Sequence, residues 1–123
     1  MSKKILIVDD SEFDREIMKR FLTKAGYDNL VLAETGEEGL QKARTEQPDL
    51  IVLDVMLPKL DGFKICRMLK FDEKYKDIPI LMCTSLAREA DEATGFEVGA
   101  NDYITKNFDP PDLIAKVKKL LGE

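Results

Sequence analysis

Short apolar runs alternate along the chain with longer segments in which apolar residues recur every three or four positions. The short runs are rich in Ile, Val and Leu and are typical of β-strands, whereas the longer segments have the spacing of amphipathic helices. We predict strands at 5–8, 30–33, 50–53, 79–83 and 102–104. We predict helices within 11–26, 35–47, 63–71, 87–98 and 109–120.

Residues that cap helices set the predicted helix boundaries. Ser11 and Thr35 are each followed three residues later by an acidic residue, which is the pattern of a capping box, and Asp109-Pro110 fits the start of the last helix. Gly95 lies inside the fourth helix and makes it the least well specified. The predicted buried stripes are Phe13, Ile17 and Phe21 in the first helix and Leu113, Val117 and Leu120 in the last.

Five strand–helix units in succession predict an α/β fold. Strands that are joined through helices run parallel, and the helices cover both faces of the sheet. The strands at 5–8, 50–53 and 79–83 are apolar almost throughout, as expected for strands that are buried on both faces. Because the chain has 123 residues and no internal repeat or linker, we expect a single domain over 1–123.

Polar residues follow four of the five predicted strands at the point where each strand ends. The carboxyl edge of an open parallel sheet is where functional groups gather. The residues are Asp9 and Asp10 after the first strand, Asp54 after the third, Thr84 and Ser85 after the fourth, and Lys106 after the fifth. Each alone is also explained as a cap of the next turn or helix, but the joint pattern predicts a site.

The predicted site has the chemistry of phosphoryl transfer with Mg²⁺. The clustered carboxylates of Asp9, Asp10 and Asp54 repel one another unless a cation neutralises them, and an all-oxygen donor set favours Mg²⁺. The three carboxylates, Mg²⁺ and Lys106 have charges that sum to zero. Asp54 would be the nucleophile that forms an acyl phosphate, and the Thr84 hydroxyl could donate to a phosphoryl oxygen.

Composition narrows the possible classes of protein. The chain has no histidine, which excludes a Ser-His-Asp triad and a His-ligated zinc site, and its net charge of −5 argues against binding nucleic acid. No apolar run approaches the roughly 20 residues of a membrane span, and the N-terminal residues lack a signal-peptide pattern, so we expect a cytoplasmic protein. Cys66 and Cys83 are predicted to be buried thiols rather than a disulfide or metal pair.

These residues resemble the CheY-like receiver domains of two-component signalling. The resemblance covers essentially the whole chain, and its motifs are highly specific when taken together. They are the segments 5–10 (ILIVDD), 54–62 (DVMLPKLDG), 84–85 (TS) and 99–106 (GANDYITK). The resemblance implies a flavodoxin-like sheet of strand order 2-1-3-4-5 with five helices on both faces.

The resemblance also implies a role for each site residue. The roles are phosphoacceptor for Asp54, direct metal ligand for Asp10, metal ligand through water for Asp9, backbone carbonyl ligand for Met56, switch hydroxyl for Thr84, switch aromatic for Tyr103 and phosphate contact for Lys106. The implied partners are a sensor histidine kinase or phosphotransfer protein and a downstream target or output domain, with a possible homodimer. Phosphorylation would draw Thr84 toward the phosphoryl group, let Tyr103 turn inward and change the surface of the fourth helix, the fifth strand and the fifth helix. Such a chain is a signalling domain rather than a turnover enzyme.

The sequence departs from the family pattern after Lys106. Most receiver domains have a proline there that follows a cis peptide bond, whereas this chain has Asn107. Since a cis bond before a residue other than proline costs roughly 3 kcal/mol, we predict a trans bond between Lys106 and Asn107.

Three other functions fit parts of the pattern. A phosphatase of the haloacid dehalogenase type needs a second Asp two residues after its nucleophile, where this chain has Met56, which cannot transfer a proton. A flavin mononucleotide site after the first strand would meet repulsion between the phosphate and Asp9-Asp10. A degenerate receiver that acts only as an interaction module stays open because of Asn107.

Overall fold

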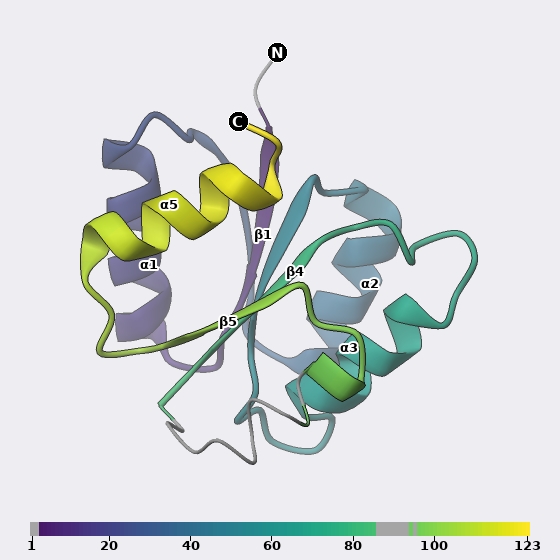
Figure 1. Ribbon diagram of the computed structural model, residues 1–123. Helices are drawn as coiled ribbons and strands as arrows, with labels where there is room; N and C mark the ends of the chain where they lie inside the picture. The colour runs from purple at the N-terminus through teal and green to yellow at the C-terminus, as the bar shows by residue number, and fades with distance from the viewer. Residues whose placement is uncertain (1–2, 86–93, 95) are drawn as a thin grey trace.

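Five parallel strands run through the centre of the computed structural model, which describes residues 3–85, 94 and 96–123 (Figure 1). Their order across the sheet is β2-β1-β3-β4-β5, and every neighbouring pair is parallel. The strands are β1 (Lys4–Val8), β2 (Asn29–Ala33), β3 (Leu50–Asp54), β4 (Ile80–Thr84) and β5 (Asp102–Thr105). The predicted fold class and strand order are confirmed.

Helices cover both faces of the sheet, with α1 and α5 on one side and α2 and α3 on the other (Figure 1). Their bounds are α1 (Glu12–Lys24), α2 (Gly36–Glu46), α3 (Gly62–Lys70) and α5 (Pro110–Leu120). The helix predicted at 87–98 lies mostly outside the described residues, although Thr94, Phe96 and Glu97 are described and helical. None of the described helices is long and apolar enough to cross a membrane.

Alternate residues of each central strand pack into different cores. In β1, Ile5 and Ile7 belong to the core under α1 and α5, whereas Leu6 and Val8 belong to the core under α2 and α3. This alternation follows from the two-residue period of a strand. All of β3 and β4 is buried, as their apolar sequences predicted, so the residues that end them are held in a rigid surrounding.

Side-chain caps begin three of the described helices. The hydroxyl oxygens of Ser11 and Thr35 accept from the backbone N–H groups three residues later, at 3.2 and 3.1 Å. A carboxylate oxygen of Asp61 does the same for α3, at 3.0 Å. Asp109 makes no such bond, and Pro110 occupies the first position of α5. The helix starts predicted at Ser11, Thr35 and Asp109 are confirmed. Neither predicted capping box is reciprocal, because the Asp14 carboxylate bonds Lys106 and the Glu38 carboxylate accepts from the Glu34 N–H.

The stripe predicted to be buried on the first helix is wrong in part. Phe13 is 72% exposed, and the buried residues of α1 are Arg15, Met18 and Leu22. Ile17 and Phe21, which were predicted to be buried, are only partly covered at the flank. The helix is therefore rotated by a fraction of a turn from the predicted orientation, because Met18 and Leu22 face the sheet.

The last helix follows its prediction more closely. Leu113 and Val117 are fully buried, but Leu120 is partly exposed and Leu121 packs in the core instead. Cys66 and Cys83 are both free and buried, as predicted, and burial raises the pKa of their thiols to about 11 and about 12. Both thiols therefore stay protonated at neutral pH.

Candidate metal and phosphoryl site

The sheet register brings four predicted site residues to one edge. Asp54 ends β3 and Thr84 ends β4, while Asp9 and Lys106 directly follow β1 and β5. This edge lies at the opposite end of the sheet from the two chain termini (Figure 1). The arrangement confirms that these side chains share one region, as the strand-end argument predicted.

Three carboxylates of this edge form a group that fits a divalent cation. One oxygen each from Asp9, Asp10 and Asp54 lies within 4.8 Å of the others. Asp9 and Asp54 are 7% and 2% exposed, whereas Asp10 is exposed and gives the group an opening to solvent. Such a set of oxygen donors, partly open to water, is what Mg²⁺ prefers, because it keeps several of its waters.

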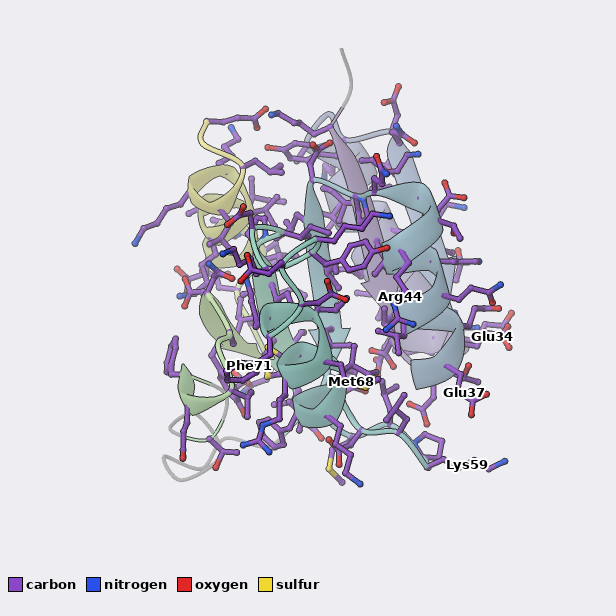
Figure 2. The ribbon with its side chains drawn as sticks, turned by 90° about the vertical axis from the view of Figure 1, so that its right-hand side faces the viewer. Glu34, Glu37, Arg44, Lys59, Met68 and Phe71 are labelled. Atoms are coloured by element: carbon purple, nitrogen blue, oxygen red, sulfur yellow. The ribbon has the colours of Figure 1, made fainter. Side chains whose placement is uncertain are left out.

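The loop after Asp54 supports one side of its carboxylate. The Met56 N–H donates to Asp54 Oδ1 at 3.0 Å, and the Met56 side chain is 56% exposed. Lys59 lies at the tip of this loop with a positive φ of 67° and points away from the sheet, as Figure 2 shows. The Gly62 N–H donates to the Val55 carbonyl at 3.1 Å and returns the chain to the sheet edge.

Lys106 is surrounded by carboxylates. Its Nζ lies 2.9 Å from Asp9 Oδ2 and 3.1 Å from Asp54 Oδ2, two residues that the sequence had predicted to share a site with it. Its shortest contact, 2.8 Å, is to Oδ2 of Asp14. Sequence reasoning missed Asp14 as a site residue because it explained that residue as a helix-capping partner.

Burial and charge shape the protonation of the site. Burial, and then the charge of Asp9, raise the pKa of Asp54, while the bond from Met56 N–H and the charge of Lys106 oppose the rise. Burial alone would lower the pKa of Lys106, but its bonds to Asp14 and Asp9 and the charge of Asp54 raise it above its usual value. Lys106 is therefore always charged, and Asp54 is a carboxylate whose ionised form is disfavoured.

A buried arginine contacts the backbone of the acidic group. Arg15 is 8% exposed, and its Nη1 donates to the Asp9 carbonyl at 2.7 Å. Its Nη2 reaches Glu34 at 3.4 Å, and Figure 2 shows Glu34 at the outer edge of the molecule. Arg15 was not predicted as a site residue, and a cation in an apolar helix stripe is the only signal that could have indicated it.

The two residues predicted to act as a switch are both buried. Thr84 is fully buried and Tyr103 is 5% exposed, packed in the core under α2 and α3. The Tyr103 side chain already has the inward position that the resemblance assigned to the phosphorylated chain. Because the side chain is already buried, the structure does not show the outward position from which the predicted inward movement would begin. The switch role of Tyr103 stays a prediction.

The peptide bond between Lys106 and Asn107 is trans, as predicted. No peptide bond among the described residues is cis. The Lys106 N–H donates to the Thr84 carbonyl at 2.7 Å, which fixes the backbone at the sheet edge. The Thr105 hydroxyl donates to Oδ1 of Asn107 at 2.5 Å and closes the turn that follows.

Comparison with known proteins identifies the protein family to which the chain belongs. Residues 5–118 match the model of the response regulator receiver domain family, so the chain belongs to that family. A solved structure of a putative response regulator from Chloroflexus aurantiacus has a TM-score of 0.94 at 37% identity, with all of both chains covered. The chemotaxis protein CheY4 of Vibrio cholerae has a TM-score of 0.88 at 32% identity, covering 98% of this chain and 99% of that one.

The curated relatives are longer proteins. The alkaline phosphatase synthesis transcriptional regulatory protein PhoP of Bacillus subtilis is 50% identical over 98% of this chain and 49% of its own length. The master transcriptional regulator RpaA of Synechocystis is 46% identical over 96% of this chain and 48% of its own length. The chain thus spans about half the length of these relatives, and the matched half is the receiver domain.

Proposed function

We propose that this receiver domain accepts a phosphoryl group on Asp54 from the phosphohistidine of a sensor kinase or phosphotransfer protein. The observation that carries the proposal is the Asp54 carboxylate, which is 2% exposed, belongs to the candidate metal group and lies 3.1 Å from the Lys106 ammonium group. Such a buried nucleophile beside a fixed cation suits a reaction in which charge develops on phosphoryl oxygens.

The transfer itself is a substitution at phosphorus. One oxygen of Asp54 forms the new P–O bond while the P–N bond to the donor imidazole breaks, and the released imidazole takes up a proton from solvent. Asp54 Oδ1 is held by the Met56 N–H and Oδ2 by Lys106, so both oxygens are oriented before the donor arrives. Bound Mg²⁺ would offset the charge that the phosphoryl group adds to Asp9, Asp10 and Asp54.

The proposed output is a change of surface beyond the site. Thr84 ends β4 and pairs with Thr105, which ends the adjacent strand β5 directly before Lys106. A phosphoryl group that engages the Thr84 hydroxyl would bias the packing of Tyr103 two residues before Thr105, and with it the surface of β5 and α5. Because the longer relatives are transcriptional regulators, we propose that an output domain or a separate protein recognises the changed surface.

Acetyl phosphate with Mg²⁺ tests the proposal without the unidentified kinase. The expected result is a gain of one phosphoryl mass on the intact chain, absent in EDTA and removed by neutral hydroxylamine, which cleaves acyl phosphates but not phosphate esters. Peptide mapping should place the modification on Asp54. A chain that gains no mass in saturating Mg²⁺, or that is modified on another residue, would overturn the proposal.

Magnesium is also expected to stabilise the fold. A ligand that binds only the folded chain stabilises it by about 1.4 kcal/mol at a concentration tenfold above its Kd. We therefore expect the melting temperature to rise by several degrees between EDTA and millimolar Mg²⁺, and to rise less in Asp10→Asn. Asp28→Asn, which removes an exposed carboxylate from another part of the chain, serves as the control and should respond to Mg²⁺ like the parent. An equal rise in all three chains would mean that the cation acts elsewhere.

A further inference from the structure

We propose that Asp14 is a positioning residue that holds the Lys106 ammonium group over Asp54 during phosphoryl transfer. The inference rests on the proposed function and adds a residue to it. Lys106 Nζ lies 2.8 Å from Asp14 Oδ2, closer than to either of its other two carboxylate partners. Asp14 would act through the lysine and not on the phosphoryl group.

Asp14 is fixed by the first turn of a helix. Its own N–H donates to Ser11 Oγ, which places it at the third position of α1. An acidic residue at that position commonly bonds back to the N–H of the cap residue. Here the Ser11 N–H donates instead to Asp9 Oδ1 at 2.9 Å, so the Asp14 carboxylate is free of capping and reaches Lys106.

Lys106 needs such an anchor because, among the described residues at the sheet, its side chain is held only by the two carboxylates that also belong to the candidate metal group, Asp9 and Asp54. The bond from its N–H to the Thr84 carbonyl fixes the start of a four-carbon side chain, which has many rotamers. The Lys106 side chain is 21% exposed, so solvent competes for its ammonium group. Because α1 is a rigid element, its carboxylate limits where the ammonium group can lie.

The anchor matters most when a metal ion is present. The residues that form the candidate metal group are Asp9, Asp10 and Asp54, and Asp14 is not among them. A cation bound there would neutralise part of the negative charge of Asp9 and Asp54, two of the three carboxylates that hold Lys106. It would also repel the Lys106 ammonium group. Asp14 would then be the partner that keeps its full charge for Lys106 and offsets this repulsion.

A purely structural salt bridge between α1 and the segment after β5 makes a different prediction. That role would change the free energy of unfolding and leave the rate of transfer in the folded chain unchanged. The positioning role changes the maximal rate, because a small misplacement of a group at the reacting centre costs roughly ten- to a hundredfold. The two roles are therefore separable by kinetics on folded protein.

The test compares Asp14→Ala, Asp14→Asn and the control Glu12→Gln for phosphorylation by acetyl phosphate. Glu12 is an exposed acid of the same helical turn, so its variant reports the effect of removing one charge nearby. We expect the maximal rate of Asp14→Ala to fall about tenfold with the Mg²⁺ half-saturation changed less than twofold. Asp14→Asn, which keeps an oxygen acceptor, should fall less, and Glu12→Gln should match the parent.

A double-mutant cycle gives a second, independent readout. If Asp14 acts through the lysine, then Asp14→Ala should have no further effect on the rate in a Lys106→Ala background. Thermal unfolding of every variant at the assay conditions shows that folded chains are compared. An unchanged or faster rate in Asp14→Ala, or rate losses that multiply in the double variant, would overturn the inference. Failure of the parent chain to take up phosphate would instead overturn the proposed function.

Discussion

Replacement of Asp54 by asparagine is expected to abolish phosphorylation and at the same time to stabilise the metal-free fold. The loss of phosphorylation follows because the amide cannot form an acyl phosphate. The gain in stability follows because burial and the charge of Asp9 make the ionised form of Asp54 unfavourable in the folded chain. An amide of nearly the same shape removes that cost. We therefore expect the free energy of unfolding to increase by about 1 kcal/mol at neutral pH, as measured by urea unfolding in EDTA.

The pH dependence of this difference has a definite sign. The pKa of Asp54 is raised from its ordinary value of 3.8, so folding favours the protonated form. The stability that this proton provides is complete below the ordinary pKa and is lost as the pH rises through the raised one. The advantage of Asp54→Asn should therefore shrink as the buffer is made more acidic.

Asp28→Asn provides the matched control for both measurements. It makes the same chemical change at an exposed position between α1 and β2. It should be phosphorylated like the parent and should unfold at nearly the same urea concentration. A metal-free Asp54→Asn chain that unfolds more easily than the parent would show that the bond to Lys106 outweighs the cost of burying the carboxylate.

Gly62→Ala is expected to destabilise the fold by about 3 kcal/mol or more, because the added methyl group would overlap backbone atoms next to Asp54. A Cβ at this position would lie 2.2 Å from the Asp54 carbonyl oxygen and 2.9 Å from Val55 Cα. Asp54 ends the fully buried strand β3 and Val55 directly follows it, so these backbone atoms cannot move without displacing the end of β3. Chemical denaturation measures the loss, and the residual folded chain should be phosphorylated more slowly.

Gly122→Ala separates steric overlap from backbone strain. Gly122 has a φ of 75°, and no atom lies within 4 Å of the place that an alanine methyl group would take, so this substitution meets only the conformational cost of about 1 kcal/mol. Gly62 is not among the glycines with positive φ, so its loss would come from overlap alone. Similar losses in the two variants would mean that the turn after β3 relaxes more easily than its contacts indicate.

The sheet and most of the site could be predicted because both depend on local sequence patterns. Apolar runs separated by helical segments determine a parallel sheet, and the residue after each run must lie at its carboxyl edge. Asp9, Asp54 and Lys106 were found in this way, and the structure places them within salt-bridge distance. The trans bond after Lys106 was predictable from the chemistry of one peptide unit.

The parts that sequence missed depend on how elements are oriented against one another. In α1, several apolar residues fit a helical stripe, and only packing on the sheet selects Met18 and Leu22 while leaving Phe13 exposed. The contact of Asp14 with Lys106 was hidden because capping and salt-bridge formation require the same residue type at the same position. The inward position of Tyr103 is a choice of side-chain rotamer, on which the strand pattern is silent.

Asp9 joins two parts of the molecule through a single carboxylate. One oxygen closes the N-terminal turn of α1 through the Ser11 N–H, and the other balances the Lys106 ammonium group. Its carbonyl is held in turn by the buried Arg15 of the same helix. A cation bound to this carboxylate would compete with both contacts at once, so we expect occupancy of the acidic edge to be thermodynamically linked to the start of α1 and to the position of Lys106.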